Sequence, residues 1–541
     1  MSQDDCTCAA LLLDSARAHA GTDAIVLPGD RVTYAELVGG ARRWARRLID
    51  LGVAPGDHVG LFMPNSSDFM CVLFGAMLAG AVPVPINSRY RGPEIADIVS
   101  DADLLVVVTN NLVGQPVNPA ERLAEALPDL PSAADPRRLA LAAAPSLRSV
   151  LVAAGPAVAG MIASDTLSES ADSAVDARWR AVRPDQTGLI LYTSGSTSRP
   201  KGCLLSHAAM VTQGRLMAER YRMTAADRIW SPVPMFHIGG ISPVIAILSV
   251  GGSFLSMARF EAGPGLAMMA EEKATISYVL FQTLITDLLH LPDFADHDLS
   301  RIRLMVSNLA MQPAWIAAQL AERFPNAVQI GTFGLTETNG AACTHAPDDP
   351  PADRLHRLGR PLPGVSVRVV GGDGRDLAAG DIGEVLLRGP TLCSGYYKAA
   401  DKTAATLRDG WLYTGDRGSL DAAGSVMFHG RLKDVLKVGG ENVGALEVES
   451  VVGAHPAVKG CAVVGMPDPR LVEVPVAFVE LRPGSHASEA EIKAFCSGKL
   501  ASFKQPRRVF FLQEWPMSAT KIDKPELVRR LASLIQESNA V

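Results

Sequence analysis

The segment LILYTSGSTSRPKG, residues 189–202, joins an apolar strand to a loop rich in glycine and short hydroxyl side chains. Consecutive backbone N–H groups in such a loop can surround a phosphate group, and Lys201 adds a positive charge. The spacing differs from the GxxxxGK[ST] pattern of a Walker A loop. A plain surface turn has the same composition, but the preceding strand and the following Arg-Pro-Lys-Gly favour phosphate binding. We expect a helix after Lys201.

Three further segments carry groups suited to nucleotide chemistry. PMFHIGG (234–240) contains His237, GTFGLTET (331–338) contains Glu337, and WLYTGD (411–416) ends on Asp416. A single carboxylate completed by substrate phosphates suits Mg²⁺, which prefers oxygen ligands. Taken one at a time, these residues have simpler interpretations as a packed histidine, a solvated loop carboxylate and a turn residue.

In this order along the chain, the segments resemble the motifs of the adenylate-forming superfamily, which includes acyl-CoA synthetases, firefly luciferases and peptide-synthetase adenylation domains. The signature TSGTTGxPKG matches residues 193–202 except at Ser196 and Ser198. The resemblance extends from about Arg31 to Leu527, and several independent motifs agree in their order. It favours the acyl-CoA synthetase branch of the superfamily.

The resemblance implies a role for each motif. Phe333 would stack on adenine, Thr336 would contact the α-phosphate, and Glu337 would hold Mg²⁺. Asp416 would accept hydrogen bonds from the ribose hydroxyls, and Arg431 would contact ribose or phosphate. The complete nucleotide set is Thr193, Ser194, Gly195, Ser196, Thr197, Lys201, Asn308, Thr332, Phe333, Thr336, Asp416 and Arg431. The acyl set is His237, Ser307, Leu309, Gly334 and Leu335.

The implied reaction has two steps. The substrate carboxylate attacks the α-phosphorus of ATP and expels pyrophosphate, assisted by a lysine that resembles Lys521, with Lys524 as the alternative. The small domain then rotates about a hinge at Lys433, and CoA attacks the acyl-adenylate. Gly439 and Gly440 would line the CoA tunnel, because glycine lets a ligand pass close to the backbone. Contacts made after the rotation would come from Lys437 and Asn442. The catalytic set is Lys521, Glu337, Thr336, His237 and Lys437.

Three departures from the family pattern affect this expectation. PMSATK lacks one position of the usual PxTxxGK, which removes about 3.3 Å of reach, so the loop must be re-routed for Lys521 to reach the phosphate. Ser198 replaces a glycine, at a cost of roughly 1–2 kcal/mol if the position needs positive φ. Asn308 and Leu309 are bulkier than the usual turn residues beside adenine. Two alternatives therefore stay open: a partner enzyme that supplies the adenylate, and an adenylation module that loads a carrier protein.

The elements that must position these residues follow an alternating pattern. Helical segments alternate with short apolar runs up to about residue 430, which predicts βαβ units and an α/β domain, 1–430, of stacked, mainly parallel sheets. Thr33 is the expected cap of an amphipathic helix. Residues 112–186 are expected to form a lengthened surface connection with some helix. From residue 431 shorter units predict a small, mobile α+β domain, 431–541.

Composition limits the remaining possibilities. The chain has 541 residues, a net charge of −6 and eight scattered cysteines, and we find no basic stripe for nucleic acid. This composition favours reduced thiols and a cytoplasmic location. Residues 69–86 are interpreted as a buried helix and strand rather than a membrane span. The expected ligands are ATP or acyl-AMP, Mg²⁺, CoA and a carboxylic acid that the sequence does not identify, and a homodimer is left open.

Overall fold

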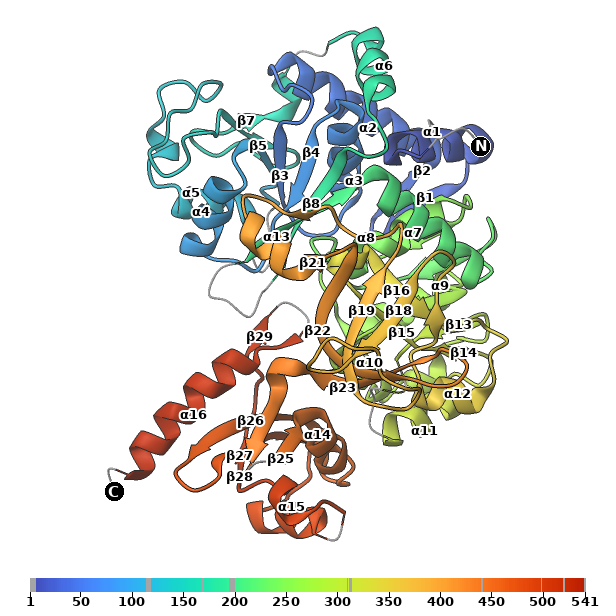
Figure 1. Ribbon diagram of the computed structural model, residues 1–541. Coiled ribbons are helices and arrows are strands. Elements are labelled where there is room, and N and C mark those ends of the chain that lie inside the picture. The colour runs from blue at the N-terminus through green and yellow to red at the C-terminus, as the bar shows by residue number, and fades with distance from the viewer. Residues whose placement is uncertain are drawn as a thin grey trace.

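A larger N-terminal body and a smaller C-terminal body make up the computed structural model (Figure 1). The structure describes residues 6–112, 118–167, 170–193, 200–308, 310, 314–438, 441–497, 499–518 and 521–539. Among these residues, no helix is both long enough and apolar enough to cross a bilayer.

Two mainly parallel sheets form the centre of the N-terminal body. The seven-stranded sheet has the order β14-β13-β12-β10-β11-β1-β2, and only β1 and β2 pair in antiparallel fashion. The five-stranded sheet has the order β4-β3-β5-β6-β7 and is parallel throughout. Their strands are β1 Asp23–Leu27, β2 Asp30–Thr33, β3 His58–Phe62, β4 Val82–Pro85, β5 Leu104–Thr109, β6 Ser149–Val152, β7 Ile162–Ala163, β10 Arg228–Trp230, β11 Ser253–Leu255, β12 Ile276–Tyr278, β13 Leu304–Val306 and β14 Val328–Ile330.

Helices cover both faces of these sheets, as expected where βαβ connections supply the crossovers. One apolar cluster joins strands of both sheets with helices α1, α2, α3, α7 and α8. Residues Phe69 to Leu78 of α3 are all buried, which explains why this segment is apolar on every side. The helices of this body are α1 Cys8–His19, α2 Tyr34–Asp50, α3 Ser67–Leu78, α4 Gly92–Asp101, α5 Pro119–Ala126, α6 Asp172–Ala181, α7 His207–Arg220, α8 Ile238–Leu248, α9 Ala262–Glu271, α10 Gln282–Leu289, α11 Ala314–Arg323, α12 Pro351–His356 and α13 Ala400–Thr406.

Three smaller antiparallel sheets lie beside the parallel ones and carry most of the predicted site residues. Their orders are β20-β9-β8, β15-β16-β17 and β18-β19-β22-β21, with β23 also paired to β22. Their strands are β8 Thr187–Thr193, β9 Lys201–Ser206, β15 Thr332–Leu335, β16 Gly340–Thr344, β17 Arg360–Pro361, β18 Ser366–Val370, β19 Gly383–Arg388, β20 Gly395–Tyr396, β21 Leu407–Arg408, β22 Trp411–Leu420 and β23 Val426–Arg431.

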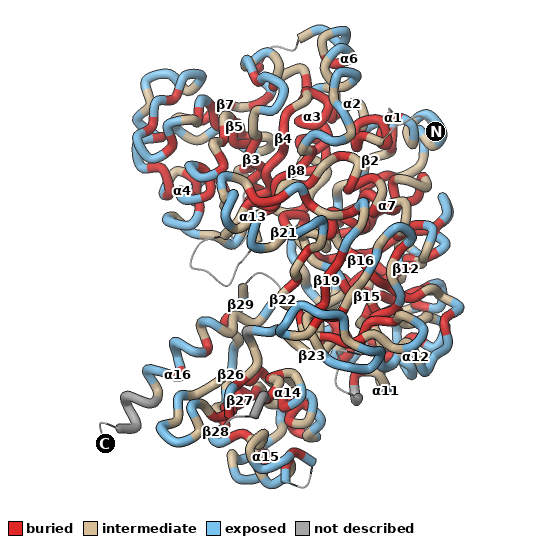
Figure 2. The backbone as a smooth tube through the Cα atoms, viewed as in Figure 1, coloured by how far each residue is buried: buried red, intermediate tan, exposed pale blue. Residues whose placement is uncertain are grey.

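The C-terminal body begins after β23 with a separate sheet of order β25-β24-β27-β26, with β28 paired to β27. A hairpin of β29 and β30 follows and leads into α16, where exposed residues alternate with the buried Leu527 and Leu531 (Figure 2). The elements are β24 Val435–Val438, β25 Glu441–Gly444, α14 Ala445–Gly453, β26 Val458–Asp468, β27 Val472–Leu481, α15 Glu489–Cys496, β28 Arg508–Phe511, β29 Met517–Ser518, β30 Lys521–Ile522 and α16 Lys524–Asn539.

The structure confirms the α/β class and most of the predicted elements. Thr33 caps α2 through a capping box with Glu36, as the sequence predicted. Two expectations were wrong. Residues 112–186 include β6 and β7, which extend the five-stranded sheet, so this segment is not only a surface connection with some helix. Lys201 begins strand β9, paired with β8, and the expected helix starts six residues later at His207.

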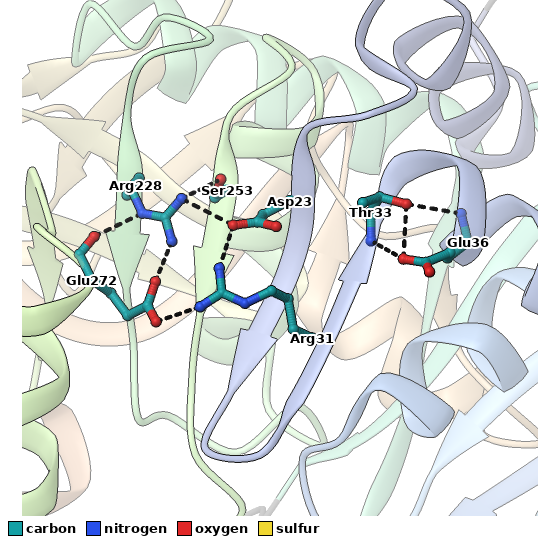
Figure 3. A network of polar contacts seen from close by, with 7 residues as sticks. All are labelled: Asp23, Arg31, Thr33, Glu36, Arg228, Ser253 and Glu272. Carbon is teal, nitrogen blue, oxygen red and sulfur yellow. Dashed lines mark hydrogen bonds and ion pairs between the residues drawn. The ribbon is translucent and has the colours of Figure 1, made fainter.

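A polar network ties the N-terminal hairpin to the seven-stranded sheet (Figure 3). Arg31 and Arg228 each form ion pairs with both Asp23 and Glu272. Arg228 also donates from Nε to the carbonyl of Glu272, at 2.7 Å. Because the two carboxylates are shared between two guanidinium groups, β1, β2, β10 and the end of α9 are fixed in one arrangement.

Val472 has a strained backbone at the start of β27. Its φ is +73° and its side chain is 69% exposed, although β-branched residues strongly avoid this conformation. We predict that Val472→Gly raises the free energy of unfolding of the C-terminal body by about 0.5–1 kcal/mol, because relief of strain exceeds glycine's added unfolded-state entropy. Urea unfolding would measure this change. The control Val528→Gly, in helix α16, should lower stability, and a loss in both variants would contradict the prediction.

Candidate functional site

An ion pair between Asp416 and Arg431 lies where the N-terminal body ends. The two residues are cross-strand partners in β22 and β23, and Arg431 Nε is 2.7 Å from Asp416 Oδ1. Asp416 is 3% exposed, and its N–H donates to Thr414 Oγ1 at 3.0 Å. Gly415 precedes it with φ +70°, a conformation that glycine adopts freely. The sequence motif therefore lies in an irregular part of strand β22 that holds one carboxylate inside the protein.

The environment of Asp416 makes its carboxylate unusually basic. Burial raises its pKa to about 6, although the charges of Arg431 and Lys521 act in the opposite direction. The carboxylates of Glu337 and Asp434 add to the increase. At neutral pH the group is mostly ionised and can accept hydrogen bonds, as the predicted ribose contact requires.

Glu337 lies in a single 3-10 turn, Thr336–Thr338, directly after β15. Its Oε1 accepts a hydrogen bond from the Tyr396 hydroxyl at 2.7 Å, and its carbonyl accepts one from Cys393 N–H at 2.8 Å. Lys201 Nζ lies 5.1 Å from the centre of the Tyr396 ring. Tyr396 thus connects the phosphate-loop lysine to the carboxylate. It was missed in the sequence, because SGYY carries no spacing that sets Tyr396 apart from Tyr397.

The donor set around Glu337 is compatible with Mg²⁺ only if other ligands come from the substrate. Among the described residues, no group of three or more histidine, cysteine, aspartate or glutamate side chains could hold a metal ion. One carboxylate beside Lys201 suits an ion that is coordinated mainly by phosphates and water.

Strand β15 carries residues that were predicted to contact adenine and residues that were predicted to contact the acyl group. Phe333 is 5% exposed, and its ring packs 6.3 Å from that of Phe428, which leaves little area for a base. Stacking of Phe333 on adenine therefore stays a prediction. Gly334 cannot be replaced, because a Cβ there would lie 1.9 Å from the Gly340 carbonyl oxygen. Leu335 and Thr332, at the two ends of the strand, are partly exposed.

Ser307 and Asn308 belong to the SNLAM segment, which the sequence analysis identified as a departure from the family pattern. Asn308 has φ +52°, a conformation that asparagine tolerates better than most residues. Its Oδ1 accepts a hydrogen bond from Thr332 N–H at 2.8 Å, which ties the turn to β15. Ser307 is fully buried, and its hydroxyl donates to Gln329 Oε1 at 2.7 Å. Asn308 thus combines a positive φ with a side-chain hydrogen bond that fixes the turn. Leu309 lies outside the described residues.

His237 borders a pocket that both bodies line. Burial lowers the pKa of His237 to about 4, with smaller effects from Lys521 and Arg89, so the ring is neutral at pH 7. Its Nε2 is buried and has no hydrogen-bond partner among the described residues. The pocket has a cavity volume of about 20 Å³, room for about one water molecule, and is lined by Pro85, Ile86, Asn87, Tyr90, Ile98, Tyr192, Phe236, His237 and Ser518.

The hairpin β29–β30 brings Lys521 to this site. Ser518 pairs directly with Lys521, so only residues 519 and 520 connect the strands. The charge of Lys521 acts to lower the pKa of both Asp416 and His237, whereas burial is the main cause of each shift. Lys524 points elsewhere, with Nζ 2.8 Å from Glu449 Oε1. The structure thus brings Lys521, and not Lys524, to the candidate site.

The remaining predicted residues divide into two groups. Thr193 pairs with Lys201 at the end of β8, whereas Lys437 pairs with Asn442 in the C-terminal sheet. Lys433 lies in a 3-10 turn, Leu432–Asp434, between the last strand of one body and the first strand of the other. Several predictions fall on residues outside those described, namely Ser194, Gly195, Ser196, Thr197, Ser198, Gly439 and Gly440.

Comparison with known proteins gives matches over nearly the whole chain. Residues 12–397 match the family described as AMP-binding enzyme, and residues 447–521 match the AMP-binding enzyme C-terminal domain. An indoleacetate–CoA ligase of Aromatoleum aromaticum is 32% identical over 95% of this chain and 97% of its own. The long-chain-fatty-acid–CoA ligase FadD13 of Mycobacterium tuberculosis is 31% identical over 91% of both chains. The crystal structure of the anthranilate CoA ligase AuaEII with anthranoyl-AMP superposes with a TM-score of 0.85 at 28% identity, covering 99% of this chain and all of that one.

The raised pKa of Asp416 predicts a pH-dependent loss of stability. Because its folded pKa is about 6 and its ordinary value 3.8, the folded state binds more protons between these values. The free energy of unfolding therefore falls as the pH rises through this window. Replacing Asp416 with asparagine should remove this part of the pH dependence, up to about 3 kcal/mol between pH 4 and pH 7. Urea unfolding at both pH values measures this difference.

The matched control is Asp376→Asn, whose parent side chain is 62% exposed. This variant should keep the pH dependence of the parent chain. If the Asp416→Asn and parent curves run parallel between pH 4 and pH 7, the carboxylate of Asp416 is not destabilised by burial.

Proposed function

This chain belongs to the AMP-binding enzyme family, and we propose that it is an acyl-CoA ligase that joins a carboxylic acid to CoA through an acyl-adenylate. The CoA ligases among its relatives support this activity. The observation that carries the proposal is the convergence of Lys521 from the C-terminal body with the buried Asp416–Arg431 pair. An acidic group that binds ribose and a mobile cation that meets phosphate are what adenylate formation needs.

In the first step, a carboxylate oxygen of the acid attacks the α-phosphorus of ATP. The bond from that phosphorus to the pyrophosphate oxygen breaks, and the acyl-adenylate forms. Asp416 binds the ribose, while Lys201 and Lys521 neutralise phosphate charge that grows in the transition state. Mg²⁺, held by Glu337 together with ATP oxygens, would supply further charge neutralisation. The neutral ring of His237 can orient the acid by one hydrogen bond without adding charge.

In the second step, the CoA sulfur attacks the adenylate carbonyl, loses its proton, and releases AMP. Lys521 has no part in this attack, and a site occupied by its hairpin leaves little room for the pantetheine arm. We therefore propose that the C-terminal body, from residue 431, turns about Lys433 between the steps. The location of the turn Leu432–Asp434 between two separate sheets supports this hinge. The turn would bring Lys437, Asn442 and the glycines at 439 and 440 to the CoA path.

The same geometry argues against a split reaction in which a partner enzyme supplies the adenylate. That alternative rested on two departures from the family pattern, Ser198, which lies outside the described residues, and the short PMSATK loop. In the hairpin, two residues connect the strands, and the charge of Lys521 still acts on the pKa of Asp416 and of His237. We propose that one chain performs both steps, with ATP, CoA and a carboxylic acid as its substrates.

The test is formation of CoA thioesters from a panel of acids. The panel contains short and long aliphatic acids, indole-3-acetate and 2-aminobenzoate, each with ATP, MgCl₂ and CoA. We predict ATP-dependent thioester formation with at least one acid, and a loss of roughly 100-fold or more in kcat/KM for Glu337→Ala, because an electrostatic partner of the phosphates is removed. Thioester release is followed by chromatography.

The matched variant for Glu337→Ala is Tyr396→Phe, which removes the hydroxyl that contacts Glu337 but leaves the carboxylate. This variant should lose less than tenfold, because a single neutral hydrogen bond contributes about 1 kcal/mol. Equal losses in the two variants would remove Glu337 from the metal site. If the parent chain formed no thioester with any acid, the proposed ligase activity would be contradicted for these classes of acid.

A further inference from the structure

Lys524 lies three residues after Lys521, at the first position of helix α16. Its Nζ is 2.8 Å from Glu449 Oε1 on α14 and 3.9 Å from Asp434 Oδ2 in the turn after the hinge. The three side chains are only 26%, 16% and 31% exposed. A lysine so enclosed by two carboxylates is poorly placed to leave them for a substrate.

The carboxylate that receives Lys524 is itself fixed. Glu449 Oε1 also accepts a hydrogen bond from Val463 N–H, at 2.7 Å, which ties α14 to β26. Burial alone would lower the pKa of Lys524, but Glu449 and Asp434 outweigh it and raise the pKa. Lys524 therefore stays charged and forms a partly buried connection between three elements, α16, α14 and the turn Leu432–Asp434.

The base of the Lys521 hairpin is directly continuous with this connection. Asp523 N–H donates to the Pro516 carbonyl at 2.8 Å, which closes the hairpin. Asp523 Oδ1 accepts from Glu526 N–H at 3.1 Å, which begins α16. Ile522 packs in an apolar cluster that includes Leu527 of α16. The hairpin and the start of the helix therefore move as one unit.

A short hairpin transmits the position of its base to its tip. Only residues 519 and 520 separate Ser518 from Lys521, so the connection has little length with which to correct a misplaced base. Ser518 also lines the pocket beside His237, so this strand of the hairpin lies against the N-terminal body. The position of Lys521 in the site is thus set by whatever fixes residues 516–524.

We propose that Lys524 is a positioning residue, whose ion pairs with Glu449 and Asp434 fix the base of the β29–β30 hairpin and thereby place Lys521 over the nucleotide. The expected effect on adenylation kinetics rests on the proposed function, whereas the expected effect on the position of the hairpin does not. Lys524 acts only in the adenylation step, because Lys521 is needed only there. The shortened motif makes this role more important, since a longer loop could adapt its own course.

Hydrogen exchange in the full chain, without any substrate, tests the structural part. Lys524→Ala should speed amide exchange of residues 517–523 by roughly tenfold, because part of the local opening free energy comes from the ion pairs. Lys524→Arg keeps the charge and should stay close to the parent chain. The matched control is Arg529→Ala on the same helix, whose ion pair with Glu526 is exposed and should not affect the hairpin.

Half-reaction kinetics with indole-3-acetate, or whichever panel acid the parent enzyme uses best, test the functional part. In acid-dependent ATP–pyrophosphate exchange, Lys524→Ala should lower kcat by about 10- to 100-fold while KM for ATP changes less than threefold, since small misplacements of a catalytic group have effects of this size. Thioester formation from the synthetic acyl-adenylate should change less than threefold. Lys524→Arg should restore most of the exchange rate.

Three results would overturn the proposal: unchanged hydrogen exchange of the hairpin in Lys524→Ala, equal loss of both half-reactions, or failure of Lys524→Arg to recover exchange. Faster amide exchange in a protein that shows no ligase activity with any acid would contradict the proposed function and leave the positioning of the hairpin supported. A general loss of folding in Lys524→Ala would appear as faster exchange throughout the C-terminal sheet and would also count against a local role.

Discussion

The ion pair between Asp416 and Arg431 is the constraint on which the rest of the site depends. A carboxylate that is 3% exposed is unfavourable unless a cation accompanies it, and here the cation is the last residue of β23. The pair therefore fixes the edge of the N-terminal body at the residue where the chain leaves it. The connecting turn, the second sheet and the Lys521 hairpin all begin from this point. In the proposed mechanism, nucleotide binding and movement of the C-terminal body share one structural anchor.

In the C-terminal body, Lys521 is held in position by a paired hairpin rather than by a long loop. A family motif shortened by one residue removes about 3.3 Å of chain, and the structure compensates with a paired hairpin of which Lys521 is the first residue of the second strand. This arrangement requires a well-fixed base, which Lys524, Glu449 and Asp434 supply. Lys524, the alternative candidate for the catalytic lysine, thus explains how the shorter loop can hold Lys521 in position.

The sequence predicted elements whose physical signal is local. The helix cap at Thr33 and the apolar runs of β3, β4 and β5 needed no tertiary information. Prediction from the sequence failed for elements and contacts that depend on pairing with other parts of the chain. The strand β6 is four residues long and gains its place from pairing with β5, and β9 is a strand because β8 and β20 lie beside it. Tyr396 could not be identified for the same reason, since its contact with Glu337 spans 59 residues. The positive φ of Asn308 was likewise not predictable from the sequence, because many residues with short polar side chains do not adopt it.

The most direct test of the central claim compares both half-reactions in Lys521→Ala. ATP–pyrophosphate exchange measures adenylation, and thioester formation from the synthetic acyl-adenylate and CoA measures the second step. If Lys521 serves the α-phosphate from the hairpin, exchange should fall by roughly 100-fold or more, while the second step should stay within about threefold of the parent rate. Undiminished exchange, or an equal fall in both reactions, would contradict the account.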